Sequence, residues 1–116
     1  SRGLGDVYKR QGLKEVTKQL QQTNYSSLHL VMGFVSDKDV KEILHFFPAN
    51  AQYYFSQPDV PRKLHIEELK KIVSKNLSAN YYQTIAEALQ AAKEKANAKD
   101  LIYIGGSTFV VAEVID

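Results

Sequence analysis

Apolar residues follow two different spacings along the chain, and together these predict alternating helices and strands. Helices are predicted where apolar residues recur every three or four positions, over 12–22, 40–47, 65–75 and 82–96. Strands are predicted where short apolar or aromatic runs lie between turn residues, over 28–35, 51–55, 101–104 and 108–115. The connector 77–81 has room for one further short strand.

This order predicts an α/β fold with a Rossmann-like, three-layer αβα architecture. Strands that alternate with helices need crossover connections and form a mostly parallel sheet. The last two strands are separated by a short turn from Gly105 to Ser107, so the final strand is predicted to be an antiparallel edge strand. Because the first predicted element is a helix, we expect the first strand of this architecture to be missing from the chain.

Length and composition limit the class of protein. The chain has 116 residues, enough for one domain and too few for two. Fifteen basic and thirteen acidic residues leave a formal charge of +2, so we expect neither nucleic acid nor a membrane as a partner. The lack of cysteine excludes disulfides and thiolate metal sites, and it fits a cytoplasmic protein.

The first residues differ in character from the rest. Residues 1–11, SRGLGDVYKRQ, show no apolar period, and 6–11 resemble the translation of an adapter used in preparing sequencing libraries. We therefore interpret 1–11 as non-native or disordered and place the domain at 12–116. An ordinary flexible amino terminus is the alternative.

Polar residues gather where the predicted strands end. The strand 28–35 runs into Ser36, Asp37, Lys38 and Asp39, and the strand 51–55 is followed by a loop that contains Arg62. Open α/β sheets bind ligands at the carboxyl ends of their strands, so these segments and Gly105 to Ser107 are expected to share one crevice.

The residue types at this crevice suit an anionic ligand. Lys38 offers a point charge for a carboxylate or phosphate, and Arg62 offers a bidentate donor pair. Gly105 and Gly106 allow close approach of the backbone, and Ser107 adds a hydroxyl.

Purely structural roles for the same residues stay open. Ser36 or Asp37 can cap the following helix, and the charges of Asp37, Lys38 and Asp39 can be solvated. The two glycines can simply form a tight turn, and Arg62 can be a surface residue.

The sequence predicts no catalytic residue and no metal site within this chain. The three histidines, His29, His45 and His65, lack metal-ligand spacing and are interpreted as structural. The phosphate-loop pattern Gly-x-x-x-x-Gly-Lys-Ser/Thr is absent, so any ATP must be held mainly by another domain.

Four motifs together resemble a known family. They are Gly33-Phe-Val-Ser-Asp-Lys-Asp-Val40, Pro61-Arg62, a helix with Ala86, Ala88, Ala91 and Ala92, and Asp100-Leu-Ile-Tyr-Ile-Gly-Gly-Ser107. In this order they resemble the carboxy-terminal domain of the folylpolyglutamate synthase / dihydrofolate synthase family of the Mur ligase superfamily. The similarity runs from about Gly12 to Asp116.

The resemblance implies a function. Enzymes of this family use ATP and Mg²⁺ to phosphorylate a folate or dihydropteroate carboxylate, and the amine of L-glutamate attacks the acyl phosphate. It implies that Lys38 and Ser107 lie at the amino-acid site, with Asp37, Asp39 and Arg62 as further candidate substrate-binding residues. ATP and Mg²⁺ would be held mainly by an ATPase domain that precedes this one in the same protein.

The chain also departs from the family pattern. The Asp-Gly-Ala-His-Asn-type motif that precedes the first helix is missing, so the chain resembles a truncated fragment, which we expect to be inactive alone. Two alternatives stay open: the carboxy-terminal domain of a peptidoglycan-precursor Mur ligase, and a stand-alone, non-catalytic α/β binding domain.

Overall fold

The sheet of this protein is mostly parallel, as the alternation of elements predicts. The computed structural model describes residues 13–106 and 111–114. Their strands form one sheet in the order β3-β2-β1-β4-β5. β1 pairs in parallel with β2 and β4, β2 pairs in parallel with β3, and β5 is antiparallel to β4. The strands are β1 (Leu28–Gly33), β2 (Gln52–Ser56), β3 (Ser78–Tyr81), β4 (Leu101–Gly106) and β5 (Val111–Val114).

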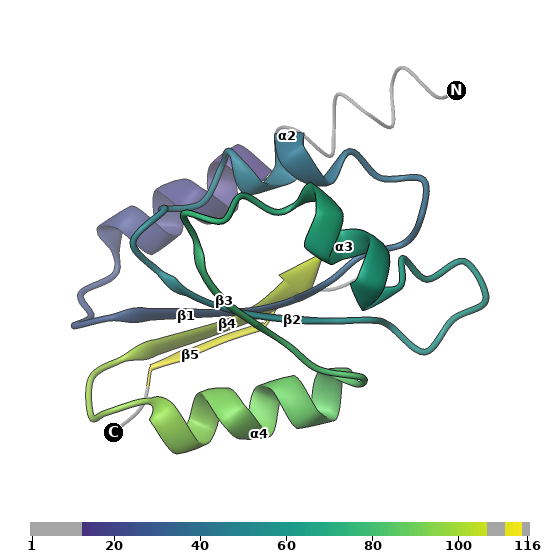
Figure 1. The fold of residues 1–116 in the computed structure, drawn as a ribbon. Coiled ribbons are helices and arrows are strands. Elements are labelled where there is room, and N and C mark those ends of the chain that lie inside the picture. Colours follow the sequence, from purple (N-terminus) through teal and green to yellow (C-terminus); the bar gives the residue numbers. More distant parts are fainter. Residues whose placement is uncertain (1–12, 107–110, 115–116) are drawn as a thin grey trace.

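Helices cover the sheet from both sides and give three layers (Figure 1). The helical residues 13–22, α2 (Val40–Leu44) and α3 (Ile66–Ile72) lie on one side, here called the α2 face. α4 (Ile85–Lys95) lies on the opposite side, the α4 face. The expected three-layer αβα architecture is therefore confirmed.

The central strand β1 is buried along its whole length because both of its faces are covered. Leu30 and Met32 point into the core of the α2 face, which also holds Leu69 of α3. Val31 points to the α4 face, where Ala88 and Ala92 let the helix lie close to the sheet. This two-sided burial explains why the predicted strand reads as a continuous apolar run rather than an alternating one.

The boundaries of several elements differ from the predicted ones. β1 ends at Gly33, and Val35 instead forms an isolated antiparallel bridge with Lys63. β4 extends to Gly106, so the two glycines belong to the strand, and their prediction as a turn was wrong. The short strand expected within 77–81 is present as β3.

Other expectations concern parts of the chain that the structure leaves out. Residues 1–11, interpreted above as non-native or disordered, lie outside the described residues, as do Ser107 and the beginning of the predicted last strand. The domain boundary at residue 12 and the missing first strand stay predictions. Within 13–106 and 111–114, the helices are too short or too polar to cross a membrane.

The close packing of α4 gives a test of the fold. Ala88 of α4 is 0% exposed where the helix faces the sheet, whereas Ala86 of the same helix is exposed. Ala88→Leu should lower the free energy of unfolding by about 1–3 kcal/mol, because extra methylene groups in a filled core force the helix away from the sheet. Ala86→Leu, the matched control, should change it by less than about 0.5 kcal/mol. Urea unfolding measures both, and equal effects would contradict this packing.

Candidate functional site

The carboxyl ends of the three central strands meet at one edge of the sheet. Gly33 at the end of β1 pairs in register with Ser56 of β2 and with Gly106 of β4. The three strands therefore end side by side, as expected for a crevice at this edge. Ser107 follows Gly106 directly in sequence but lies outside the described residues.

The loops after β1 and β2 are tied together by backbone hydrogen bonds. The Ser36 N–H donates to the Arg62 carbonyl oxygen over 2.7 Å, and the Leu64 N–H donates to the Phe34 carbonyl oxygen over 2.8 Å. With the bridge between Val35 and Lys63, these bonds make a short antiparallel ribbon beyond the sheet. The two predicted site segments, 36–39 and 56–62, are thus brought together by backbone contacts.

Two of the predicted site residues form an ion pair across this ribbon. Arg62 Nη1 lies 3.1 Å from Asp37 Oδ2, with side chains 70% and 58% exposed. Exposed pairs of this kind stabilise a protein by about 0–1 kcal/mol. The pair therefore orients the guanidinium only weakly. An anionic ligand can compete with Asp37 for Arg62.

The residue that caps α2 is not one of the two proposed above. The cap is Asp39, whose Oδ1 accepts a hydrogen bond from the Glu42 N–H over 3.2 Å. The interpretation of Ser36 or Asp37 as the cap was wrong, because Asp39 directly precedes the first helical residue, Val40, whereas Ser36 and Asp37 lie in the turn before it. Lys38, which lies between the two aspartates in the sequence, is half-buried. Its backbone N–H donates to the Val35 carbonyl oxygen.

Gln57, which directly follows β2 and was not singled out from the sequence, connects this edge to the residues at the starts of α3 and α4. Its Oε1 accepts from the Ile66 N–H over 3.1 Å at the start of α3, where the N-cap His65 makes no side-chain cap bond. Its Nε2 donates to Gln83 Oε1 over 3.3 Å, ahead of α4. Its position directly after a strand was the only sequence signal.

Of the two glycines expected to let the backbone approach a ligand, Gly105 meets protein atoms instead, and so does Gly33 at the end of β1. A side chain on Gly33 would start 3.3 Å from Pro58 Cδ and from the Ser56 carbonyl oxygen. A side chain on Gly105 would start 2.6 Å from the Tyr103 hydroxyl. Small residues here serve close packing at the edge.

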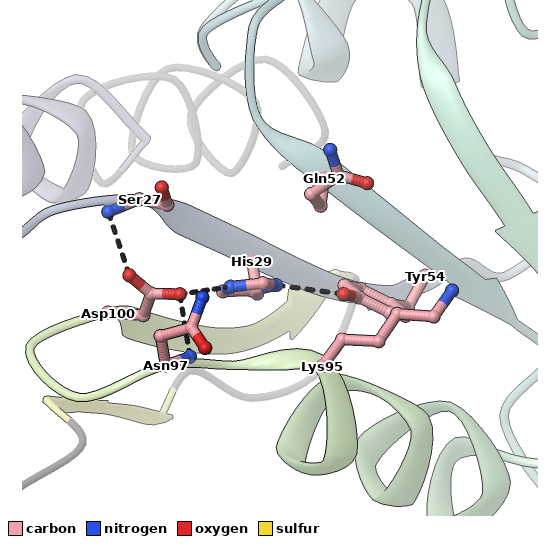
Figure 2. Close-up of a pocket in the computed structure, with 7 residues that line it drawn as sticks. All are labelled: Ser27, His29, Gln52, Tyr54, Lys95, Asn97 and Asp100. Carbon is pink, nitrogen blue, oxygen red and sulfur yellow. Dashed lines mark hydrogen bonds and ion pairs between the residues drawn. The ribbon is translucent and has the colours of Figure 1, made fainter.

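A second polar cluster lies at the opposite, amino-terminal edge of the sheet. Figure 2 shows His29 of β1 between Asp100, which precedes β4, and Tyr54 of β2. His29 Nε2 lies 2.8 Å from Asp100 Oδ2, and Nδ1 lies 2.8 Å from the Tyr54 hydroxyl oxygen. A neutral imidazole satisfies both contacts when Nε2–H donates to Asp100 and Tyr54 O–H donates to Nδ1.

Asp100 joins three segments of the chain. Its Oδ1 accepts from the Ser27 N–H over 3.1 Å, and its Oδ2 accepts from the Asn97 N–H over 3.0 Å as well as from His29. The bond from Asn97, followed by that from His29, lowers the pKa of Asp100. Burial raises the pKa of Tyr54 to about 12, with smaller contributions from Tyr82 and Asp100.

These residues line a hollow of about 240 Å³ together with Ser27, Gln52, Lys95 and Asn97 (Figure 2). Lys95 Nζ lies 5.6 Å from the centre of the Tyr54 ring. His29 and Asp100 are nearly inaccessible, and their polar atoms already have protein partners. The cluster is therefore a structural network, in agreement with the interpretation of His29.

The described residues also bear on metal binding. Among them, no group of three or more His, Asp or Glu side chains is close enough to hold a metal ion.

The fold and the edge described above define a Rossmann-like domain with a candidate ligand crevice at the carboxyl ends of parallel strands. Residues 9–108 match the family model described as "Mur ligase, glutamate ligase domain", so the chain belongs to this family. The resemblance drawn from the four motifs is thereby confirmed.

Two curated proteins are similar in sequence. A "Probable bifunctional folylpolyglutamate synthase/dihydropteroate synthase" of Haloferax volcanii is 31% identical over 102 residues, which are 85% of this chain and 12% of that protein. A "Dihydrofolate synthase/folylpolyglutamate synthase" of Buchnera aphidicola is 33% identical over 87 residues, 74% of this chain and 21% of that protein. The chain thus spans a small part of each relative.

Solved structures share the fold. A bifunctional folylpolyglutamate synthase/dihydrofolate synthase of Yersinia pestis, complexed with AMPPNP and Mn, has a TM-score of 0.70 at 23% identity over 82% of this chain and 23% of that one. Folylpolyglutamate synthase of Mycobacterium tuberculosis has a TM-score of 0.66 at 17% identity over 83% of this chain and 24% of that one.

The lowered pKa of Asp100 predicts a pH dependence of stability. Because the pKa is lower in the folded than in the unfolded state, Asp100 stabilises the fold fully above its unfolded pKa of about 3.9. That stabilisation is lost as the pH falls through the lower, folded pKa. The difference in unfolding free energy between wild type and Asp100→Asn should therefore shrink as the pH falls from about 5 towards about 2. This range lies on both sides of the unfolded pKa of about 3.9.

Urea unfolding across this pH range measures the difference. Asp59→Asn, which removes a carboxylate from an exposed loop, is the control and should stay close to wild type. Parallel curves for wild type and Asp100→Asn would contradict the role of the network.

Proposed function

We propose that this chain is the glutamate-binding domain of an ATP-dependent ligase that joins L-glutamate to folate or dihydropteroate. The observation that carries the proposal is the strand register, which gathers the loop with Lys38, the loop with Arg62 and the end of β4 at one edge. Membership of the glutamate ligase domain family supports glutamate as the ligand. The names of both curated relatives support a folate-type acceptor over a peptidoglycan precursor.

In this proposal the domain binds and orients the amino acid. The Lys38 ammonium attracts a glutamate carboxylate, and the Ser107 hydroxyl donates a hydrogen bond to it. Arg62 exchanges its exposed contact with Asp37 for a ligand oxygen. Asp39 supports the site through the helix cap, because it keeps the loop that carries Lys38 at the edge.

The reaction itself is amide formation from an acyl phosphate. The glutamate nitrogen forms a bond to the acyl carbon and loses a proton, while the carbon–oxygen bond to phosphate breaks and phosphate leaves with the electron pair. Holding the amine beside the acyl carbon converts a bimolecular step into one between fixed partners.

ATP and a divalent metal are proposed for the longer ligase. A Yersinia pestis relative was solved with AMPPNP and Mn, but the described residues here offer no metal-binding cluster. The phosphate-loop pattern is absent from the sequence, so in this proposal the residues of this domain carry no step of ATP chemistry. We assign that step to an ATPase domain preceding this one in the same protein.

Substitutions at the crevice test the site in the longer ligase. Lys38→Ala and Ser107→Ala should each raise the KM for glutamate about tenfold or more, because a hydrogen bond to a charged group is worth about 1.5–3 kcal/mol. Lys41→Ala, which removes an exposed charge from the adjacent α2, is the control and should leave KM unchanged. Unchanged KM in both crevice variants would remove these residues from the site.

The division of roles between domains predicts how the 116-residue chain behaves alone. Isothermal titration calorimetry with Mg·ATP should give no heat of binding, and titration with L-glutamate should give weak or undetectable binding. Tight ATP binding by this chain would contradict the assignment of ATP to another domain.

A further inference from the structure

Tyr103 is one of the most deeply buried side chains of the described structure, and its position relates to the proposed crevice. It lies in β4, is 1% exposed, and belongs to the core of the α2 face. Its ring centre lies 5.4 Å from that of Phe47, which fixes the ring from above the sheet.

The phenol of Tyr103 extends along β4 towards the carboxyl edge. Its hydroxyl oxygen and Cε1 lie 2.6 Å from the position that a Cβ on Gly105 would occupy, and its Cζ lies at 2.8 Å. Gly105 pairs in register with Met32, one residue before the end of β1. Glycine at 105 thus makes room for a hydroxyl group close to where the strands end.

This hydroxyl differs from those of the two other fully buried tyrosines. Tyr53 donates to the Pro48 carbonyl oxygen over 2.7 Å, and Tyr54 contacts His29. Among the described residues, the Tyr103 hydroxyl makes no hydrogen bond. No fully enclosed side-chain oxygen or nitrogen of these residues lacks a partner, so this oxygen must reach the protein exterior.

Because the oxygen reaches the exterior, water can accept its hydrogen bond in the free protein, and no buried donor is left unsatisfied. Burial raises the pKa of Tyr103 to about 12, so the hydroxyl keeps its proton near pH 7 and can donate a hydrogen bond. An acceptor oxygen of a ligand can take the place of that water.

We propose that Tyr103 is a further substrate-binding residue of the crevice, whose hydroxyl donates a hydrogen bond to a carboxylate oxygen of the bound amino acid. The inference rests on the proposed function. A carboxylate is the partner that fits, because the same edge carries the cations Lys38 and Arg62, and a phenol bonds most strongly to a charged acceptor. Tyr103 approaches this ligand from the core side of the edge, whereas the two cations approach from the loops.

The test is Tyr103→Phe in the longer ligase, with steady-state kinetics in glutamate. The ring stays over Gly105, so loss of the hydroxyl alone should raise the KM for glutamate about tenfold, with kcat changed less than about twofold. Tyr53→Phe is the matched control, because it removes a hydroxyl of equal burial from the same face. Its KM should equal that of wild type.

A second variant moves the hydroxyl without deleting it. Gly105→Ala displaces the Tyr103 ring and should also raise the KM for glutamate, even if Tyr103→Phe folds poorly. If wild type ligates glutamate and both variants keep its KM, this inference is overturned while the proposed function stands. If wild type does not ligate glutamate to any folate, the proposed function fails, and the inference fails with it.

Discussion

The parallel pairing of β1 with β2 on one side and β4 on the other is the constraint on which the rest of the structure depends. It places Gly33, Ser56 and Gly106 at one level, so the loops that follow β1 and β2 start side by side, where backbone hydrogen bonds and the Arg62–Asp37 pair join them. The pairing also buries β1 on both faces and requires a helix layer on each side. The same constraint therefore produces the three layers and brings the segments of the proposed site together.

The two edges of the sheet have different chemistry. At the amino edge, Asp100, His29 and Tyr54 form a continuous chain of hydrogen bonds, so few of their polar atoms are left for a ligand to contact. At the carboxyl edge, Arg62 has an exposed partner that a ligand can displace, and the Tyr103 hydroxyl has none among the described residues. In the proposed function, one edge stabilises the fold and the other offers donors to an anion. This agrees with the general rule for open α/β sheets.

Much of the fold could be predicted from the sequence, since the alternation of apolar periods gave the order of the elements, the parallel sheet and the antiparallel last strand. The details that failed depend on contacts far apart in the chain. Asp39 rather than Asp37 caps α2, because Asp39 directly precedes the first helical residue, Val40. Asp37 lies in the turn that follows the bridge between Val35 and Lys63, and no local pattern shows that bridge. His29 and Asp100 are separated by 71 positions, so no local pattern in the sequence could predict their contact. That the Tyr103 hydroxyl makes no hydrogen bond to the described residues can be known only from the coordinates of its surroundings.

The central claim is that the carboxyl edge of this domain holds the amino acid. A crystal structure of the longer ligase with L-glutamate bound tests it most directly. The account predicts glutamate at the ends of β1, β2 and β4, with its carboxylate oxygens within hydrogen-bonding distance of Lys38. Glutamate bound at the amino edge beside His29, or bound without contact to this domain, would contradict it.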